Sequence, residues 1–240
     1  EWLQKRLKAI GLRPISALVD VTNFISHDRG RPLHVFDAAK LKGNLRARLA
    51  AKGETILALD EAEYALDDEM TVIADDHAPR GIAGVMGGAD SGCSEATTDV
   101  FIESAFFDPV RTARTGRTLG IISDARYRFE RGVDPEFVLG GLELATKLII
   151  AFCGGEASEI SVAGKSPEWK REISFDPALV VKLAGLVLPQ DEMVEILTRL
   201  GFQIAADKPL RVRPPSWRSD VHGSADLVEE IVRIKGLDSI

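Results

Sequence analysis

A polar stretch at residues 163–171, AGKSPEWKR, divides this chain into two parts that differ in composition. It carries a proline and several charged residues, and it interrupts the apolar patterns on both of its sides. A chain of 240 residues is long enough for two domains that each bury a core of their own. We therefore expect two domains, residues 1–163 and residues 168–240, with this stretch as their linker.

The first domain mixes helix and strand patterns. Residues 1–10 follow a helical period, and residues 134–157 predict a long helix with Asp134 as its N-cap and two glycines at its end. The segment ISALVDVTNFI fits either a strand or the start of a buried helix. Strands separated by turns are predicted for the segments NLRARLA, TILALD, MTVIAD and DVFIESAFF. The domain is therefore expected to be α+β, with a mixed sheet and packed helices.

The second domain shows a compact alternation of elements. A strand in REISFD precedes a helix started by Asp176, and a second helix covers QDEMVEILTRL. Two strands follow, in FQIAA and LRVRPPS, and a last helix begins at about Ser224. This order is compatible with a small winged-helix-like α+β domain.

The overall composition, 45% apolar and 28% charged, is that of an ordinary soluble globular protein. The longest apolar runs are too short to cross a membrane, so no membrane partner is expected. Cys93 and Cys153 lie far apart and belong to no CxxC or Cys/His spacing. A thiolate zinc site is therefore not expected, and the reducing cytoplasm is the expected compartment.

Arginines gather in one segment of a chain whose net charge is −7. The overall charge argues against a general nucleic-acid-binding surface. Within 21 residues, however, there are only two acids and six arginines: Arg111, Arg114, Arg117, Arg126, Arg128 and Arg131. Such a segment can hold phosphates, although the charge pattern by itself favours solvated or salt-bridged side chains.

A glycine-rich stretch, GIAGVMGG, occupies residues 81–88. No lysine follows Gly87 and Gly88, as a P-loop would require. The segment downstream has a strand pattern, whereas a dinucleotide-binding fingerprint needs a helix there. Both kinds of nucleotide site are therefore excluded. The pattern favours a turn that needs positive φ, and a backbone that passes close to another group is the alternative.

Two ionisable residues stand in apolar surroundings. His34, in RPLHVFD, fits a packed core histidine better than a catalyst when the pattern is judged alone. Glu103, in VFIESAFF, should either face solvent or serve a polar role inside a pocket. Strand alternation does not decide between these two positions for Glu103.

Carboxylates gather near the end of the chain, in RSDVHGSADLVEEIVRI. On a helix, Asp226, Glu229 and Glu230 would share one face, and Asp220 precedes them by six residues. Hard oxygen ligands of this kind suit Mg²⁺. The pattern by itself favours an acid-rich helix N-terminus, with Asp226 and Glu229 as a capping box.

Taken together, five segments resemble the bacterial-type phenylalanine–tRNA ligase beta subunit: GLRPISALVDVTNFI, GRPLHVFDAAKLKG, GIAGVMGG, IESAFFDPVRTARTGRTLGIISDARYRFERGVDP and PSWRSDVHGSADLVEEIVRIKG. They occur in the order found in that family and span essentially the whole chain. The resemblance implies that residues 1–163 form the tRNA-editing domain and residues 168–240 the winged-helix-like domain that follows it. The aminoacylation site of the family lies in its alpha subunit.

The resemblance implies an activity, the hydrolysis of mischarged Tyr-tRNA(Phe). A pocket shaped for a phenyl ring only weakly rejects a ring that merely adds a hydroxyl, so a second site is needed. By position, Glu103 would read the tyrosine hydroxyl, and His34 would position water or the tRNA terminus near the scissile ester. Gly84 and Gly87 would leave room for the ring. The other implied substrate-binding positions are Thr22, Asn23, Ser123 and Ala125.

This sequence departs from the family at two of its positions. Ser123 stands where threonine is more typical, which keeps the hydroxyl and loses a methyl group. Arg126 stands where the family usually has a small residue, so this chain places a longer, charged side chain at the implied local tRNA contact.

The resemblance also implies partners. The partners would be tRNA(Phe), contacted through Arg111, Arg114 and Arg117, and the alpha subunit in an (αβ)₂ heterotetramer. ATP would be used by the whole enzyme and not bound by these residues. Mg²⁺ near the alpha-subunit interface would be held by Asp220, Asp226, Glu229 and Glu230.

Hydrolysis would use an oriented water with substrate assistance, since the first domain shows neither a nucleophile–base–orienter triad nor a metal-ligand pattern in its sequence. A hypothesis of a different class is a non-catalytic scaffold that docks the alpha subunit and positions tRNA. A nucleotide-binding enzyme is the third hypothesis.

Overall fold

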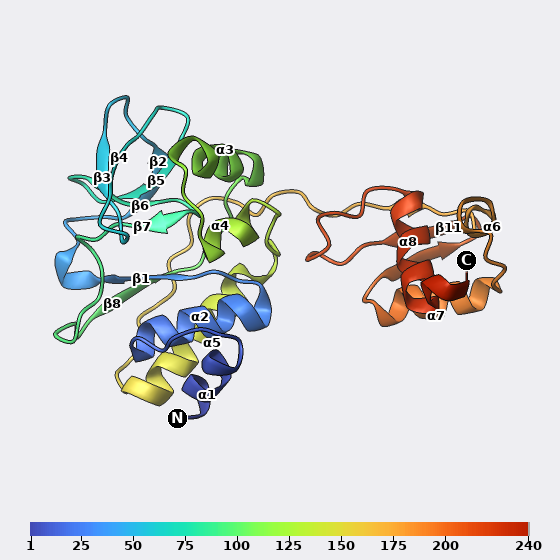
Figure 1. The fold of residues 1–240 in the computed structure, drawn as a ribbon, viewed down its shortest axis with the longest axis horizontal. Helices are drawn as coiled ribbons and strands as arrows, with labels where there is room; N and C mark the ends of the chain where they lie inside the picture. Colours follow the sequence, from blue (N-terminus) through green and yellow to red (C-terminus); the bar gives the residue numbers. More distant parts are fainter. Residues whose placement is uncertain (240) are drawn as a thin grey trace. The chain divides into compact units, whose positions relative to one another are not determined.

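The structure is a computed structural model that describes residues 1–239 and divides into two compact units, Glu1–Ser166 and Pro167–Ile240 (Figure 1). Each unit contains both helices and sheets, so the predicted α+β class is confirmed. The described residues contain no helix that is long and apolar enough to cross a membrane.

Three helices of the first unit share one core: α1 (Trp2–Ala9), α2 (Ala17–Arg29) and α5 (Phe137–Cys153). The segment that fitted either a strand or a helix is therefore helical in α2. The Ser16 side chain accepts a hydrogen bond from the Val19 N–H and caps α2. The apolar stripe of α2 then packs on α5.

Helix α5 begins later than its sequence pattern predicted. Its N-cap is Glu136 rather than Asp134, and the Asp134 carboxylate instead accepts a hydrogen bond from the Glu136 N–H. Asp134 thus organises the turn before the helix without capping it. Pro135, which fits the first turn of a helix, lies in the same turn.

A two-stranded ribbon, β1 (His34–Asp37) and β8 (Val100–Glu103), lies next to this helical layer. Figure 1 shows the ribbon between helices α2 and α5 on one side and the larger sheet on the other. The 3-10 turn η1 (Ala38–Lys40) follows β1. The residues of DVFIESAFF after Glu103 leave the strand.

The larger sheet joins β2 (Arg46–Leu49), β5 (Thr71–Ala74), β6 (Pro79–Ile82) and β7 (Met86–Gly87) in that order. A separate hairpin pairs β3 (Thr55–Leu57) with β4 (Glu63–Ala65). Strands had been predicted at β2, β3, β5 and β8. Every pairing between the described strands is antiparallel, which corrects the expected mixed sheet. Most of the paired strands are joined by short connections, whereas parallel strands would need long crossover connections.

Two helices between β8 and α5 were not predicted: α3 (Pro109–Leu119) and α4 (Asp124–Phe129). Helix α3 has Asp108 as a side-chain cap, a proline at its start and Gly120 at φ 69° after its end. Ser123 caps α4 in the same way. These capping residues were visible in the sequence as helix start and stop signals.

The second unit contains β9 (Ile173–Ser174), α6 (Ala178–Ala184), α7 (Gln190–Arg199), β10 (Gln203–Asp207), β11 (Leu210–Arg213), α8 (Ser224–Lys235) and the 3-10 turn η2 (Leu237–Ser239). Their order is the one predicted from the sequence. The sheet has the order β10-β11-β9, and one apolar cluster joins it to α6, α7 and α8.

Candidate functional site

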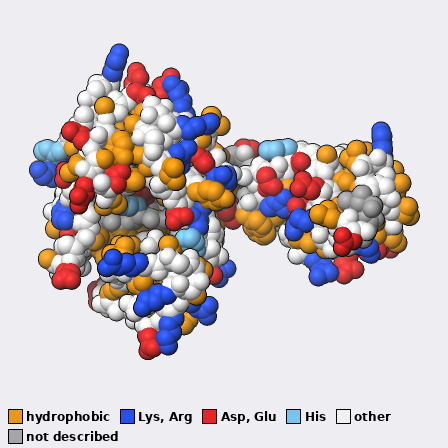
Figure 2. Space-filling model, in the orientation of Figure 1, with side chains coloured by type: hydrophobic (Ala, Val, Ile, Leu, Met, Phe, Trp, Pro, Cys, Tyr) orange, Lys and Arg blue, Asp and Glu red, His pale blue; other side chains and the backbone are white. Residues whose placement is uncertain are grey.

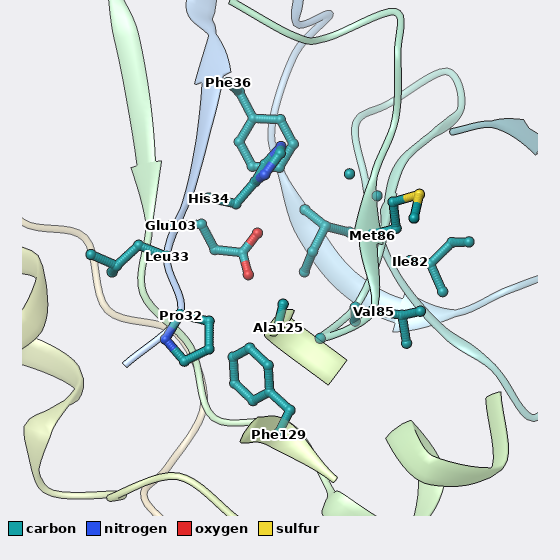
Figure 3. Close-up of a pocket in the computed structure, with 15 residues that line it drawn as sticks. Pro32, Leu33, His34, Phe36, Ile82, Val85, Met86, Glu103, Ala125 and Phe129 are labelled. Atoms are coloured by element: carbon teal, nitrogen blue, oxygen red, sulfur yellow. The ribbon is translucent and has the colours of Figure 1, made fainter. Parts of the chain in front are cut away.

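The first unit contains a pocket whose wall is mainly apolar (Figure 3). It holds about 430 Å³ of space not filled by atoms, part of it open to solvent. Its apolar lining comes from four segments of the chain and includes Pro32, Leu33, Phe36, Ile73, Ile82, Ala83, Val85, Met86 and Phe129. The predicted site residues that also line it are His34, Gly84, Gly87, Glu103 and Ala125.

His34 and Glu103 meet because of the register of the β1–β8 ribbon. In this antiparallel pair His34 lies directly opposite Glu103. Directly opposed residues project to the same face of a sheet, so both side chains point into the pocket (Figure 3). The ribbon thus joins two residues that are far apart in the sequence.

The Glu103 carboxylate has no hydrogen-bond or ion-pair partner among the described residues. Its surroundings are Pro32, Leu33 and other apolar side chains of the pocket. Burial in such surroundings disfavours the charged form and raises the pKa of Glu103 from 4.5 to about 7. The pocket therefore contains an acceptor whose hydrogen-bonding capacity is unused.

The His34 imidazole is also unpaired on one side. Its Nε2 atom is buried and has no hydrogen-bond partner among the described residues. Its ring packs edge-on against Phe36, with ring centroids 4.4 Å apart. Burial lowers the pKa of His34 from 6.5 to about 4, so the imidazole is neutral at pH 7.

The glycine stretch forms the β6–β7 hairpin and the wall opposite the ribbon. A Cβ on Gly87 would lie 2.3 Å from Cε1 of His34, so this glycine makes room for the imidazole. Gly84 has φ +70°, and a Cβ there would lie 3.0 Å from Phe107 and 3.2 Å from Phe129. The expected turn with positive φ and the expected close approach of the backbone are therefore both present.

Ser123 lies beside the pocket but not in its lining. Its hydroxyl donates to the Val85 carbonyl at 2.6 Å and accepts from the Arg126 N–H at 3.1 Å. It therefore caps α4 and ties that helix to the glycine hairpin. Arg126 itself ion-pairs with Glu130 and covers Gly116 of α3.

Thr22 and Asn23 are half-buried on α2 and also do not line the pocket. The Thr22 hydroxyl donates to the carbonyl of Val19 in its own helix. Their proposed contact with substrate stays a prediction.

Sequence reasoning did not single out Arg31, although it precedes the Pro32–His34 segment directly. Its side chain is completely buried. One guanidinium nitrogen donates to the Ala105 carbonyl at 2.6 Å, and the other terminal nitrogen donates to the Asp134 carbonyl. Burial lowers the pKa of Arg31 to about 10, and the nearby charge of Asp134 opposes that shift.

The arginines predicted to contact tRNA lie on α3. Arg114 ion-pairs with Glu69, and Arg111 donates to the Glu69 carbonyl. Arg117 is exposed, and it donates to the Ala113 carbonyl within its own helix. On the face shown in Figure 2, basic side chains are interspersed with acidic ones. Solvated or salt-bridged side chains were the arrangement that the charge pattern favoured, and Arg114 is salt-bridged while Arg117 is exposed.

The four carboxylates of the second unit do not converge on a shared point. Asp226 accepts from the N–H groups of His222 and Gly223, before the first turn of α8. Asp226 therefore accepts from the backbone N–H of the N-cap Gly223, which has no side chain to return the bond, and the expected capping box between Asp226 and Glu229 is not formed. Glu229 is exposed.

Arginine side chains form ion pairs with two more carboxylates of this group, Asp220 and Glu230. Arg218 binds both oxygens of Asp220 and also contacts Glu230. Glu230 is only 5% exposed and pairs with Arg233 as well. No group of three or more His, Cys, Asp or Glu side chains within residues 1–239 is placed to hold a metal ion. This donor set, as arranged, does not fit Mg²⁺.

Comparisons with known proteins cover both units. A family model for the B3/4 domain matches residues 1–154, and one for the tRNA synthetase B5 domain matches residues 173–237. A solved structure, an N-terminal fragment of the phenylalanyl-tRNA synthetase beta-subunit from Pyrococcus horikoshii, matches 89% of this chain and 64% of its own. The TM-score is 0.40 at 15% sequence identity.

Curated relatives match over the full length of the chain. The phenylalanine–tRNA ligase beta subunit of Bradyrhizobium diazoefficiens is 60% identical over 241 residues, and that of Paramagnetospirillum magneticum is 56% identical. The chain spans about 30% of the length of these relatives. With its B3/4 and B5 domains in order, the chain belongs to the family of phenylalanine–tRNA ligase beta subunits.

Proposed function

We propose that the first unit hydrolyses tyrosine from mischarged Tyr-tRNA(Phe), as the editing site of a phenylalanine–tRNA ligase. One observation carries the proposal: the unpaired Glu103 carboxylate and the neutral His34 imidazole lie opposite each other in an apolar pocket. The apolar wall suits an aromatic ring, and the two polar groups offer one contact for its hydroxyl and one for the ester.

Glu103 would select tyrosine over phenylalanine. A tyrosine ring that enters the pocket can donate its hydroxyl to the carboxylate, which has no other partner among the described residues. A phenylalanine ring would displace water from the carboxylate without donating a hydrogen bond to replace it. A buried polar group left unpaired costs about 1–3 kcal/mol, so the discrimination comes from rejecting phenylalanine.

His34 would hold the reacting water or the tRNA terminus. A neutral imidazole can accept a hydrogen bond from water through one nitrogen. In the hydrolysis, the water oxygen bonds to the ester carbonyl carbon and the bond from that carbon to the ribose oxygen breaks. The ribose oxygen takes up a proton, and tyrosine and tRNA are released. The neighbouring ribose hydroxyl of the substrate would assist the transfer of that proton.

Deacylation of Tyr-tRNA(Phe) and Phe-tRNA(Phe) tests this proposal in the full-length protein. We expect the wild type to hydrolyse Tyr-tRNA and spare Phe-tRNA. Glu103→Ala should lower kcat/KM for Tyr-tRNA by about 10- to 100-fold, the rate equivalent of one lost buried hydrogen bond. His34→Ala should lower kcat. Glu143→Gln, an exposed acid on α5, is the matched control. Unchanged deacylation in both pocket variants would remove these residues from the mechanism.

The alternative, a non-catalytic scaffold, is separated from editing by filling the pocket. A side chain on Gly87 collides with His34, so Gly87→Trp should abolish deacylation. Assembly with the alpha subunit should persist, because Gly87 lies in the pocket wall. If deacylation and assembly both respond, or neither does, the pocket has been assigned wrongly.

The remaining proposals concern the whole protein. As a beta subunit, it would assemble with an alpha subunit into an (αβ)₂ heterotetramer in the cytoplasm, and the assembly would use ATP to form Phe-tRNA. The exposed Arg114 and Arg117 would contact the acceptor end of tRNA. Magnesium binding by the second unit is untested and is not supported by the arrangement of its four carboxylates, and magnesium titration of the assembled enzyme would test it.

A further inference from the structure

Arg31 is a fully buried cation held by two backbone carbonyls. The stem of its side chain passes along α5, where a Cβ on Gly141 would lie 2.7 Å from Cγ of Arg31. Helix α5 therefore provides a glycine slot for this side chain. The Nε atom has no hydrogen-bond partner among the described residues. A buried guanidinium with one unused donor is costly, so its position calls for an explanation beyond packing.

The contacts of Arg31 join three chain segments, and each of them continues into the pocket. Arg31 itself directly precedes the segment that contains Pro32 and His34. Its first acceptor, Ala105, follows Glu103 by two residues. Its second acceptor, Asp134, follows α4 and its pocket residue Phe129.

The glycine hairpin, another segment of the pocket lining, is held separately through the hydrogen bond from Ser123 to the Val85 carbonyl. Arg31 is thus the common anchor of the segments that carry His34, Glu103 and Phe129. A guanidinium is suited to this role, because its planar fork of donors binds two acceptors in fixed directions.

We infer that Arg31 is a positioning residue: it fixes where His34 and Glu103 lie relative to Phe129 and the rest of the pocket, and through that position it sets the discrimination between tyrosyl and phenylalanyl esters. This inference rests on the proposed editing function. Arg31 is buried behind the pocket wall and does not line the pocket, so it acts through the two residues that do.

Two variants test the inference in the full-length protein. Arg31→Lys keeps the charge but replaces the two-pronged donor with a single ammonium. Gly141→Ala keeps Arg31 and pushes its stem out of the slot, so it remains informative if Arg31→Lys fails to fold. The control is Arg48→Lys. Arg48 also bridges two acceptors with its guanidinium, the two oxygens of Glu54, but lies on β2 away from the pocket.

The main readout is the ratio of kcat/KM for Tyr-tRNA to kcat/KM for Phe-tRNA, because this ratio does not depend on the fraction of folded protein. Loosening a reacting geometry by about 1 Å can cost up to about 100-fold in rate. We expect the ratio to fall by about 10-fold in both test variants and to stay unchanged in Arg48→Lys. An unchanged ratio in both test variants, with both rates lowered together, would overturn the inference and leave Arg31 as a structural residue.

Hydrogen exchange of the backbone amides in β1 and β8 gives a second readout that does not depend on any activity. Both test variants should exchange faster in these strands than the wild type, while the amides of β10 and β11 keep their rates. Unchanged exchange in β1 and β8 would overturn the inference. If the wild type hydrolyses neither ester, the proposed function fails, and hydrogen exchange alone then decides whether Arg31 anchors the ribbon.

Discussion

At the scale of single residues, Glu103 and His34 are perturbed in opposite directions by the same burial. The pKa of Glu103 is raised to about 7, and that of His34 is lowered to about 4. Both shifts favour neutral side chains in a pocket that lacks counter-charges. As pH rises from about 4.5 to about 7, Glu103 lowers the stability of the folded protein, because its carboxyl ionises in the unfolded chain before it ionises in the folded one. As pH falls from about 6.5 to about 4, His34 lowers the stability of the folded protein, because its imidazole is protonated in the unfolded chain before it is protonated in the folded one.

The contributions of the two residues to the pH dependence of the unfolding free energy should therefore nearly cancel in the wild type. A substitution of either residue should reveal the contribution of the other. Between pH 7 and pH 5, Glu103→Gln should lose about 2 kcal/mol of unfolding free energy relative to the wild type, since only the His34 contribution remains. His34→Gln should gain about 2 kcal/mol over the same interval, since only the Glu103 contribution remains.

Urea unfolding at pH 5 and pH 7 measures both changes, and Glu143→Gln should follow the wild type. Equal pH dependence in all four proteins would mean that neither pKa is shifted in the direction that the structure indicates.

At the scale of elements, the pocket depends on how its walls are joined. The ribbon is internally paired, whereas the short helix α4 is joined to the glycine hairpin by the Ser123 hydroxyl, which both caps the helix and donates to Val85. The resemblance implies that this residue is a substrate-binding position. In the structure it connects two parts of the wall instead.

Removing that hydroxyl should weaken both connections. Ser123→Ala should cost about 1–2 kcal/mol, the sum expected for a helix cap and a lost hydrogen bond to a carbonyl. Ser123→Thr keeps the hydroxyl and should cost less. Urea unfolding of the two variants measures this, with Ser158→Ala in the exposed segment after α5 as the control. If Ser123→Ala and Ser123→Thr are equally stable, the hydroxyl does not join the two elements.

At the scale of the whole molecule, the chain contains two units that each bury an apolar core. The cluster around Phe175 and Leu197 belongs to the second unit, and the clusters around Phe36, Val72 and Val21 belong to the first. Residues 154–172 contain neither helix nor strand and are mostly exposed. Each unit therefore has what it needs to fold independently.

Limited proteolysis should separate the two units. Trypsin should cut first at Lys165 or Lys170, which are exposed on either side of the boundary between the units, and leave two resistant fragments. Mass spectrometry identifies the cut, and circular dichroism of the separated fragments shows whether each stays folded. Initial cleavage within residues 1–153 or 173–239, or unfolding of a fragment on release, would contradict independent folding.

Much of the fold could be predicted because its signals are local. Helix α8 and the strands of the second unit follow from apolar periodicity and turn residues, which act within a few positions of the chain. Helices α3 and α4 were missed although their capping residues were present. The ambiguous segment that became α2 needed its packing partner α5, since periodicity alone fits both a strand and a helix.

The sequence by itself determined the α+β class, the order of elements in the second unit and, through long motifs, the family. It also identified His34 and Glu103 as candidates, one by one. Only the tertiary structure decided that the two residues face each other, that Gly87 makes room for His34, and that backbone N–H groups bind Asp226 while arginines pair with Glu230. The physical reason is range: helix and turn signals act between near neighbours, whereas a pocket is made by strand register and burial, which join residues that the chain itself keeps far apart.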